Sequence, residues 1–141
     1  MLILDTDGNH LYFDTSSTIK TTVTNALAKG VRLRKADLRN MDLSFLVLDG
    51  IDLREADLRY ANLNGVSLIG AHLDGADLDH VRAQYSVLDN ARLVGANLNA
   101  VDMTGAQITN TNFHGATMTS IVFLSTVFEI DPPYGIDTIS P

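Results

Sequence analysis

The chain has 141 residues, a formal net charge of −7 and no cysteine, which excludes a disulfide-stabilised fold and a thiol enzyme. Its apolar runs are far shorter than the ~20 residues that a membrane-spanning helix needs, so we expect no membrane span. The length suits a single domain, and the lack of a basic, apolar leader favours residence in the cytoplasm.

Residues 1–30 are predicted to form a β-hairpin followed by a short helix. The apolar segments 1–4 and 11–13 flank the turn-forming sequence Asp7-Gly8-Asn9, which is typical of a hairpin. The next segment has an apolar face with helical spacing, and Gly30 stands where the helix should end. The candidate N-caps are Ser16, Ser17 and Thr18. The apolar face of the helix comprises Ile19, Val23, Ala26 and Leu27.

Residues 31–130 repeat with a period of five. Every fifth position from Leu33 to Phe128 is apolar, and a second series of mostly small or branched residues stands two places earlier, from Val31 to Thr126. A five-residue step advances a helical wheel by roughly 140° and reverses the face of a strand, so neither a long helix nor a long strand fits. A short extended segment followed by a turn does fit, and such an internal period outranks local propensity.

The residue two places after each central apolar position predicts the turn. Glycine and asparagine recur there, and both residues tolerate the positive φ that tight turns require. Repeated turns of one hand coil the chain around an apolar axis. The residues that carry this signal are Gly50, Gly65, Gly70, Gly75, Gly95, Gly105, Gly115, Asn40, Asn90 and Asn110.

Individual pentads have a recognisable sequence, as in Ala36-Asp37-Leu38-Arg39 and Ala61-Asn62-Leu63-Asn64-Gly65. These runs resemble the A(D/N)LxG unit of pentapeptide-repeat proteins, and the resemblance extends over residues 31–130. It implies an all-β fold, a right-handed quadrilateral β-helix of about five coils, each made of four pentads. We expect residues 1–30 to form an N-terminal hairpin-plus-helix cap, and residues 131–141 to form a C-terminal tail. The departures from the unit are Phe45, Tyr60, Ala83, Tyr85, Ser86 and Thr111.

The last pentads carry apolar residues where upstream pentads carry polar ones. These side chains would face water in a monomer, and clustered exposed apolar surface favours an interface. Either the tail at 131–136 folds over them, or a second copy covers them as a twofold dimer. We favour a homodimer through the C-terminal coil. The predicted dimer interface comprises Ile121, Val122, Phe123, Leu124, Val127 and Phe128.

The charged residues predict an acidic partner surface. Residues twenty apart stack in a four-sided coil, so Asp37, Asp57 and Asp77 should form one column beside Arg39 and Arg59. Direct nucleic-acid binding is disfavoured, because the basic residues cluster only near one end, around residues 32–39. The predicted acidic partner surface comprises Asp37, Asp57, Asp74, Asp77, Asp79 and Asp89.

A group of outward apolar residues predicts a further contact surface. Val47, Ile69, Val87 and Val127 occupy non-core positions of pentads that the four-pentad rule places on one side of the coil. A partner that binds this side would explain them. The preference of branched residues for β-bridges explains them somewhat better, and both interpretations stay open.

Catalysis, metal binding and cofactor binding are not predicted. The four histidines stand in different columns, and no nucleophile, base and orienting group come together. His72 and Asp74, with Asp52 stacked beside them, form at most a loose metal contact that ordinary surface placement explains. The segment at 5–9 resembles a calcium loop, but His10 and Ser16 stand where Gly and Glu are needed.

We therefore predict a non-catalytic protein-interaction or assembly module. The alternative comes from the resemblance, because some pentapeptide-repeat proteins inhibit or protect DNA gyrase by presenting a rod that mimics duplex DNA. A homodimer joined at the C-terminal coil would place its acidic halves together, as such a rod requires. DNA gyrase is therefore a candidate partner.

Overall fold

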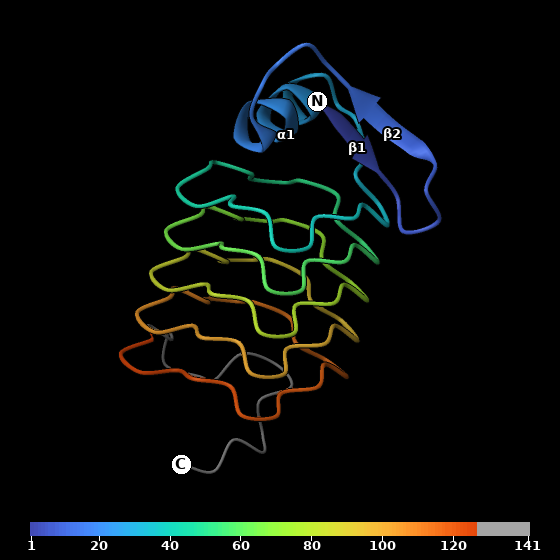
Figure 1. Ribbon diagram of the computed structural model, residues 1–141. Helices are drawn as coiled ribbons and strands as arrows, with labels where there is room; N and C mark the ends of the chain where they lie inside the picture. Colours follow the sequence, from blue (N-terminus) through green and yellow to red (C-terminus); the bar gives the residue numbers. More distant parts are fainter. Residues whose placement is uncertain (127–141) are drawn as a thin grey trace.

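The computed structural model describes residues 1–126 and shows stacked four-sided coils beneath a small N-terminal unit (Figure 1). Its elements in chain order are β1 (Leu2–Leu4), β2 (His10–Phe13) and α1 (Ile19–Ala28), followed by the coils. No helix within residues 1–126 has both the length and the apolar character to cross a membrane. Three sequence predictions lie outside the described residues: Val127, Phe128 and the tail at 131–141.

Parallel β-bridges join each coil to the next at a separation of twenty residues. The Leu38 N–H donates to the Asp57 carbonyl at 2.9 Å, and the Asp57 N–H donates to the Ala36 carbonyl at 3.0 Å. The same pattern recurs along every side of the coil, so one coil contains twenty residues and four pentads, as predicted. One complete column of bridged residues is Asp37, Asp57, Asp77, Asn97 and Thr117.

A left-handed residue turns the chain at every corner. Each fifth residue from 35 to 125 has positive φ, and twelve of these residues are not glycine. At one corner the Ala61 N–H donates to the Leu58 carbonyl at 2.9 Å and Tyr60 has φ 61°, the arrangement of a type II turn. The left-handed backbone costs about 1–2 kcal/mol in an L-residue. A bond from the Tyr60 N–H to the Asp79 carbonyl of the next coil, at 3.0 Å, offsets that cost.

The two apolar series fill the interior of the coil. The central apolar residues are almost wholly buried down to Phe113, and so are the small residues two places earlier from the second coil onward, whereas Val31, Met41 and Leu46 of the first coil are partly buried. Two buried hydroxyls interrupt this apolar interior, and each has a partner: Ser86 Oγ donates to the Ala83 carbonyl at 2.7 Å, and Thr111 Oγ1 donates to the Leu88 carbonyl at 2.8 Å. Because a buried polar group is costly only without a hydrogen bond, these departures leave the coil intact.

The N-terminal unit has the predicted hairpin and helix. Strands β1 and β2 pair antiparallel, and Thr18 is the N-cap of α1, its Oγ1 accepting from the Thr21 N–H at 3.2 Å. At the other end Gly30 has φ 68°. The Gly30 N–H donates to the Leu27 carbonyl and the Val31 N–H to the Ala26 carbonyl, both at 2.9 Å, which is the Schellman arrangement.

This unit covers the first coil (Figure 1). The Thr6 N–H donates to the Lys35 carbonyl at 2.8 Å, and the Asp37 N–H donates to the Leu4 carbonyl at 2.9 Å, so the hairpin satisfies part of the open backbone edge. Side chains from β1 and α1 are buried with the coil interior. They are Ile3, Val23 and Ala26. The predicted hairpin-plus-helix cap is therefore confirmed.

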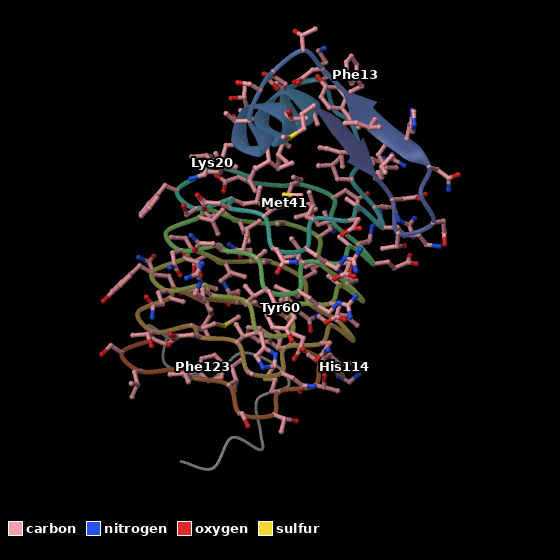
Figure 2. The ribbon with its side chains drawn as sticks, in the orientation of Figure 1. Phe13, Lys20, Met41, Tyr60, His114 and Phe123 are labelled. Atoms are coloured by element: carbon pink, nitrogen blue, oxygen red, sulfur yellow. The ribbon has the colours of Figure 1, made fainter. Side chains whose placement is uncertain are left out.

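Lys20 fastens α1 to the first coil and lies at their boundary in Figure 2. Its Nζ donates to the carbonyl and to Oγ of Ser44, both at 2.9 Å, and lies 3.2 Å from Asp42 Oδ2. Asp42 also accepts hydrogen bonds from the hydroxyl and the N–H of Ser44. These two bonds, with the charge of Lys20, lower the pKa of Asp42 to about 2 in spite of its partial desolvation.

Attachment of the cap is therefore expected to weaken in acid. The pKa of Asp42 is lower in the folded state than the ~3.9 of an unfolded aspartate, so its contribution is complete above about pH 4 and disappears as the pH falls toward 2. Urea unfolding of wild type and Asp42→Asn, followed by circular dichroism, should show wild type as the more stable protein at neutral pH and no difference near pH 2. Asp7→Asn, at the exposed hairpin turn, is the control and should show no such gap; a gap that does not change with pH would contradict the prediction.

Candidate functional site

Two carboxylates of the predicted acidic surface are held directly by arginines. Arg39 Nε and Nη2 donate to the two carboxylate oxygens of Asp37 at 2.8 and 2.7 Å, and Arg59 does the same to Asp57 at 2.9 and 2.6 Å. Each arginine also lies near the carboxylate of the next coil, Arg39 Nε at 3.5 Å from Asp57 and Arg59 Nε at 3.6 Å from Asp77. The predicted column therefore alternates charges instead of presenting free carboxylates.

These contacts keep the carboxyl groups deprotonated, and the arginine charges balance the negative charges of the carboxylates. The hydrogen bonds from Arg39 are the main reason why the pKa of Asp37 is lowered. Burial by itself would raise the pKa of Asp57, but the hydrogen bonds and charge of Arg59 exceed that effect and lower it. A basic partner that binds this side would therefore contact carboxylates that are already paired with arginine.

The neighbouring side of the coil is paired in the same way. Arg54 grips Asp52 through Nε at 2.8 Å and Nη2 at 2.7 Å, and Arg92 Nε lies 3.2 Å from Asp74. Asp52 is bridged to His72 as predicted, but its carboxylate is already bound by Arg54. Residues 1–126 contain no cluster of three His, Cys, Asp or Glu side chains able to hold a metal ion.

The last two predicted carboxylates differ from each other. Asp79 Oδ2 lies 3.0 Å from His80 Nδ1, and the His80 ring stacks on Tyr60 with ring centres 5.0 Å apart; Tyr60 is labelled in Figure 2. Asp89 accepts a hydrogen bond from the Thr109 N–H at 2.8 Å. Within residues 1–126 Asp89 makes no ion pair, so it is the predicted carboxylate that remains open to a partner.

Asp89 belongs to the fourth side of the coil, which we call the Val47 face. Val47 on this face is 66% exposed, and Ile69 is also exposed. The bridged column joins Val47 to Val87 through Ser67, so the structure brings the predicted apolar residues together. No lysine or arginine is among the outward residues of this side in residues 1–126, whereas each of the other three sides has at least one. The Val47 face comprises Val47, Ser67, Val87, Gln107, Asp49, Ile69, Asp89 and Thr109.

Two aromatic residues at the adjoining corner extend the apolar surface. Phe45 is 78% exposed and Tyr85 is 70% exposed. A Cβ added at Gly65 would lie 2.6 Å from Phe45 Cδ1, and one at Gly105 would lie 2.6 Å from Tyr85 Cδ1, so each ring rests on the glycine turn of the next coil. Sequence reasoning treated the two aromatics only as turn departures. Phe45 and Tyr85 stand two residues before Val47 and Val87, and this spacing could have predicted from the sequence that they lie beside the Val47 face.

The predicted dimer interface is partly described. Leu124 is 68% exposed and Val122 is also exposed, whereas Ile121 and Phe123 are half-buried against the apolar interior. Phe123 is labelled on the last coil in Figure 2. The last described coil therefore presents two apolar side chains outward.

Comparison with protein families identifies the repeat. A family model described as pentapeptide repeats, in eight copies, matches residues 24–59, 47–82 and 84–120. These segments together cover more than half of the chain. No curated protein matches it.

Two solved structures share the coil, and a third is a more distant match. A pentapeptide repeat protein from the thylakoid lumen of Arabidopsis thaliana is 28% identical with a TM-score of 0.51, over 64% of this chain and 59% of that one. HetL, a pentapeptide repeat protein of the cyanobacterium Nostoc involved in heterocyst differentiation regulation, is 28% identical with a TM-score of 0.52, over 67% of this chain and 50% of that one. The plasmid-mediated fluoroquinolone resistance protein QnrB1 is 16% identical with a TM-score of 0.37, over 61% of this chain and 44% of that one.

Proposed function

The chain belongs to the pentapeptide-repeat family, whose members fold as right-handed quadrilateral β-helices, and from this premise we propose that it is a non-catalytic protein-interaction module. The observation that carries the proposal is the Val47 face. It combines exposed apolar side chains with two carboxylates, Asp49 and Asp89, that make no ion pair within residues 1–126. The remaining sides have their carboxylates largely tied to arginine or lysine.

Several features support binding to a protein on this face. Exposed apolar side chains that are contiguous mark contact surfaces more often than they mark tolerated exposure. Aromatic residues such as Phe45 and Tyr85 are enriched in protein interfaces and contribute disproportionately to affinity. HetL, which shares the fold, is described as involved in the regulation of differentiation, a role that also suits an interaction module.

Val47→Asp with Val87→Asp is expected to abolish partner binding without unfolding the coil. Val47 is exposed and Val87 is half-buried on the outer side of the coil, so a carboxylate at either position still reaches water, whereas it would be stripped of water in an interface. Chemical crosslinking in cells of the source organism, with quantitative mass spectrometry, should show partners captured by wild type and lost from this variant. His72→Asp with Asn112→Asp adds two carboxylates at the same spacing on another side, and it should retain the partners. Loss of the same proteins from both variants, or from neither, would exclude the Val47 face.

We further propose a homodimer through the C-terminal coil. Exposure of Val122 and Leu124 on the last described coil supports it, because an isologous contact between two copies would remove both side chains from water. Such a dimer would present two Val47 faces to one partner or to two.

The second candidate function is a DNA-mimic inhibitor or protector of DNA gyrase. The excess of negative charge beyond residue 60 favours this candidate. Contacts of Asp74 and Asp77 with arginines weaken the negative field of that part of the coil. The candidate also requires the predicted cytoplasmic residence. The acidic residues between 61 and 126 are Asp74, Asp77, Asp79, Asp89 and Asp102, and the basic residues are Arg82 and Arg92.

Under this second candidate, the purified protein is expected to suppress supercoiling by DNA gyrase in a dose-dependent way. The suppression should weaken as salt rises, because long-range attraction to basic enzyme surfaces is screened. The measurement is agarose-gel analysis of a relaxed plasmid with gyrase and ATP. Full supercoiling in a large molar excess of the protein would leave the interaction module as the function.

A further inference from the structure

We propose that the Val47 face binds a basic amphipathic helix of a protein partner, laid along the axis of the coil. The aliphatic residues of that helix would be one turn apart, with lysine or arginine beside them. This inference rests on the proposed interaction role and specifies the chemistry of the partner.

The spacing of the apolar side chains favours a helix. They stand on three successive coils: Val47 and Val87 lie in one bridged column with Ser67 between them, and Ile69 lies in the next column, between Asp49 and Asp89. Coils are ~4.8 Å apart and helical turns ~5.4 Å apart, so the two repeats differ by on the order of 1 Å across the whole patch. An extended strand presents one face every ~6.7 Å, and it falls out of register after a single coil. Of these two conformations, the helix is the one whose repeat stays close to the spacing of the coils.

The aromatic corner gives the helix a fixed wall on one flank. Phe45 and Tyr85 stand two coils apart, and their rings rest on Gly65 and Gly105 with most of each side chain exposed. A ring that already rests on the backbone has less rotamer freedom to lose on binding. The wall therefore runs parallel to the line from Val47 to Val87.

The charges on the other flank select a basic helix. Asp49 Oδ1 accepts hydrogen bonds from Ser67 Oγ and from the Ile69 N–H, and Asp89 Oδ1 accepts from the Thr109 N–H. Both carboxylates stay uncompensated by any cation in residues 1–126 and lie on the side of the coil without lysine or arginine. Lysine or arginine next to the apolar stripe of a partner helix would pair with them, whereas an acidic helix would be repelled.

Three synthetic peptides of one length test the proposal by isothermal titration calorimetry against the full chain. The first has leucine at i, i+3, i+4 and i+7 with lysine elsewhere, which makes a basic amphipathic helix. The second has the same composition in strict alternation, which favours a strand. The third replaces every lysine of the first by glutamate. We expect the first peptide to bind more tightly than the second by about tenfold or more, and the third to show no binding.

Substitutions in the chain locate the binding. Val47→Ser with Val87→Ser, and separately Asp49→Asn with Asp89→Asn, should each weaken the first peptide about tenfold or more; the asparagines keep the oxygens that accept from Thr109 and Ile69. Val94→Ser and Asp7→Asn make the same kinds of change elsewhere, and they should leave the affinity unchanged.

The possible outcomes separate the two proposals. Equal or tighter binding of the alternating peptide would overturn the helix while keeping the face as an interaction site. Binding of the first peptide that is insensitive to the valine and aspartate substitutions would show general attraction to an acidic protein, and it would overturn the proposed site. Loss of native partners from the Val47→Asp and Val87→Asp variant, with no peptide bound, would retain the interaction role and reject the basic helix.

Discussion

Leu73→Ala is expected to lower the free energy of unfolding by about 2–5 kcal/mol, the range for leucine-to-alanine changes in a packed interior. Leu73 has no exposed surface, and it stands in a column between Leu53 of the coil above and Leu93 of the coil below. Both neighbours are fixed by hydrogen bonds between coils: the Leu53 N–H donates to the His72 carbonyl and the Leu93 N–H to the Asn112 carbonyl, both at 2.8 Å. The gap left by the leucine therefore has little means of closing.

Urea unfolding followed by circular dichroism measures this loss. Ile69→Ala removes a comparable volume from the outer surface of the same region, and it should cost less than about 1 kcal/mol. A Leu73→Ala protein no less stable than the Ile69→Ala protein would mean that the leucine column does not hold the coil together.

Val122→Asp with Leu124→Asp is expected to convert the proposed homodimer into a monomer. An isologous contact would bring four new carboxylates close to the twofold axis with no cation added, so the dissociation constant should rise by about 100-fold or more. Both side chains are exposed in the single chain, and the coil should therefore keep its fold. Size-exclusion chromatography with light scattering at micromolar concentration gives the mass directly.

Phe13→Asp is the control, because Phe13 is an exposed apolar residue at the opposite end of the molecule. It should leave the dimer unchanged. A wild-type chain that is already monomeric at micromolar concentration, or a doubly substituted chain that remains dimeric, would contradict dimerisation through the C-terminal coil.

The fold was predictable because the interior residues and the turn residues all follow the same five-residue period. Central leucines, small residues two places earlier and turn residues two places later all recur at five, and the structure places them inside and at the corners as expected. The sequence did not show that a bulky residue such as Phe45 or Tyr60 turns the chain with the same φ as glycine. Bonds between coils impose that backbone, and they are a property of the stack and not of any single pentad.

The candidate site was predicted only in part, because surface chemistry depends on which side chains meet. The twenty-residue rule placed Arg39 and Arg59 beside the carboxylate column, but only the structure shows that their guanidinium groups grip Asp37 and Asp57. That pairing removes most of the predicted acidic surface. The valines of the Val47 face were found by register, whereas their aromatic neighbours were hidden among the turn positions.

Because each coil consists of four pentads, the position of a residue within a period of twenty determines the side of the coil on which it lies. Removing twenty residues, such as 71–90, would shorten the stack by one layer and return every later side chain to its own side, because the bridges always join residues twenty apart. Removing five residues would instead rotate everything downstream by a quarter turn. A five-residue deletion between Val47 and Val87 would place them on different sides of the coil and would assemble a new surface from the same sequence. Insertions and deletions in multiples of twenty should therefore be tolerated far better than those of five, ten or fifteen.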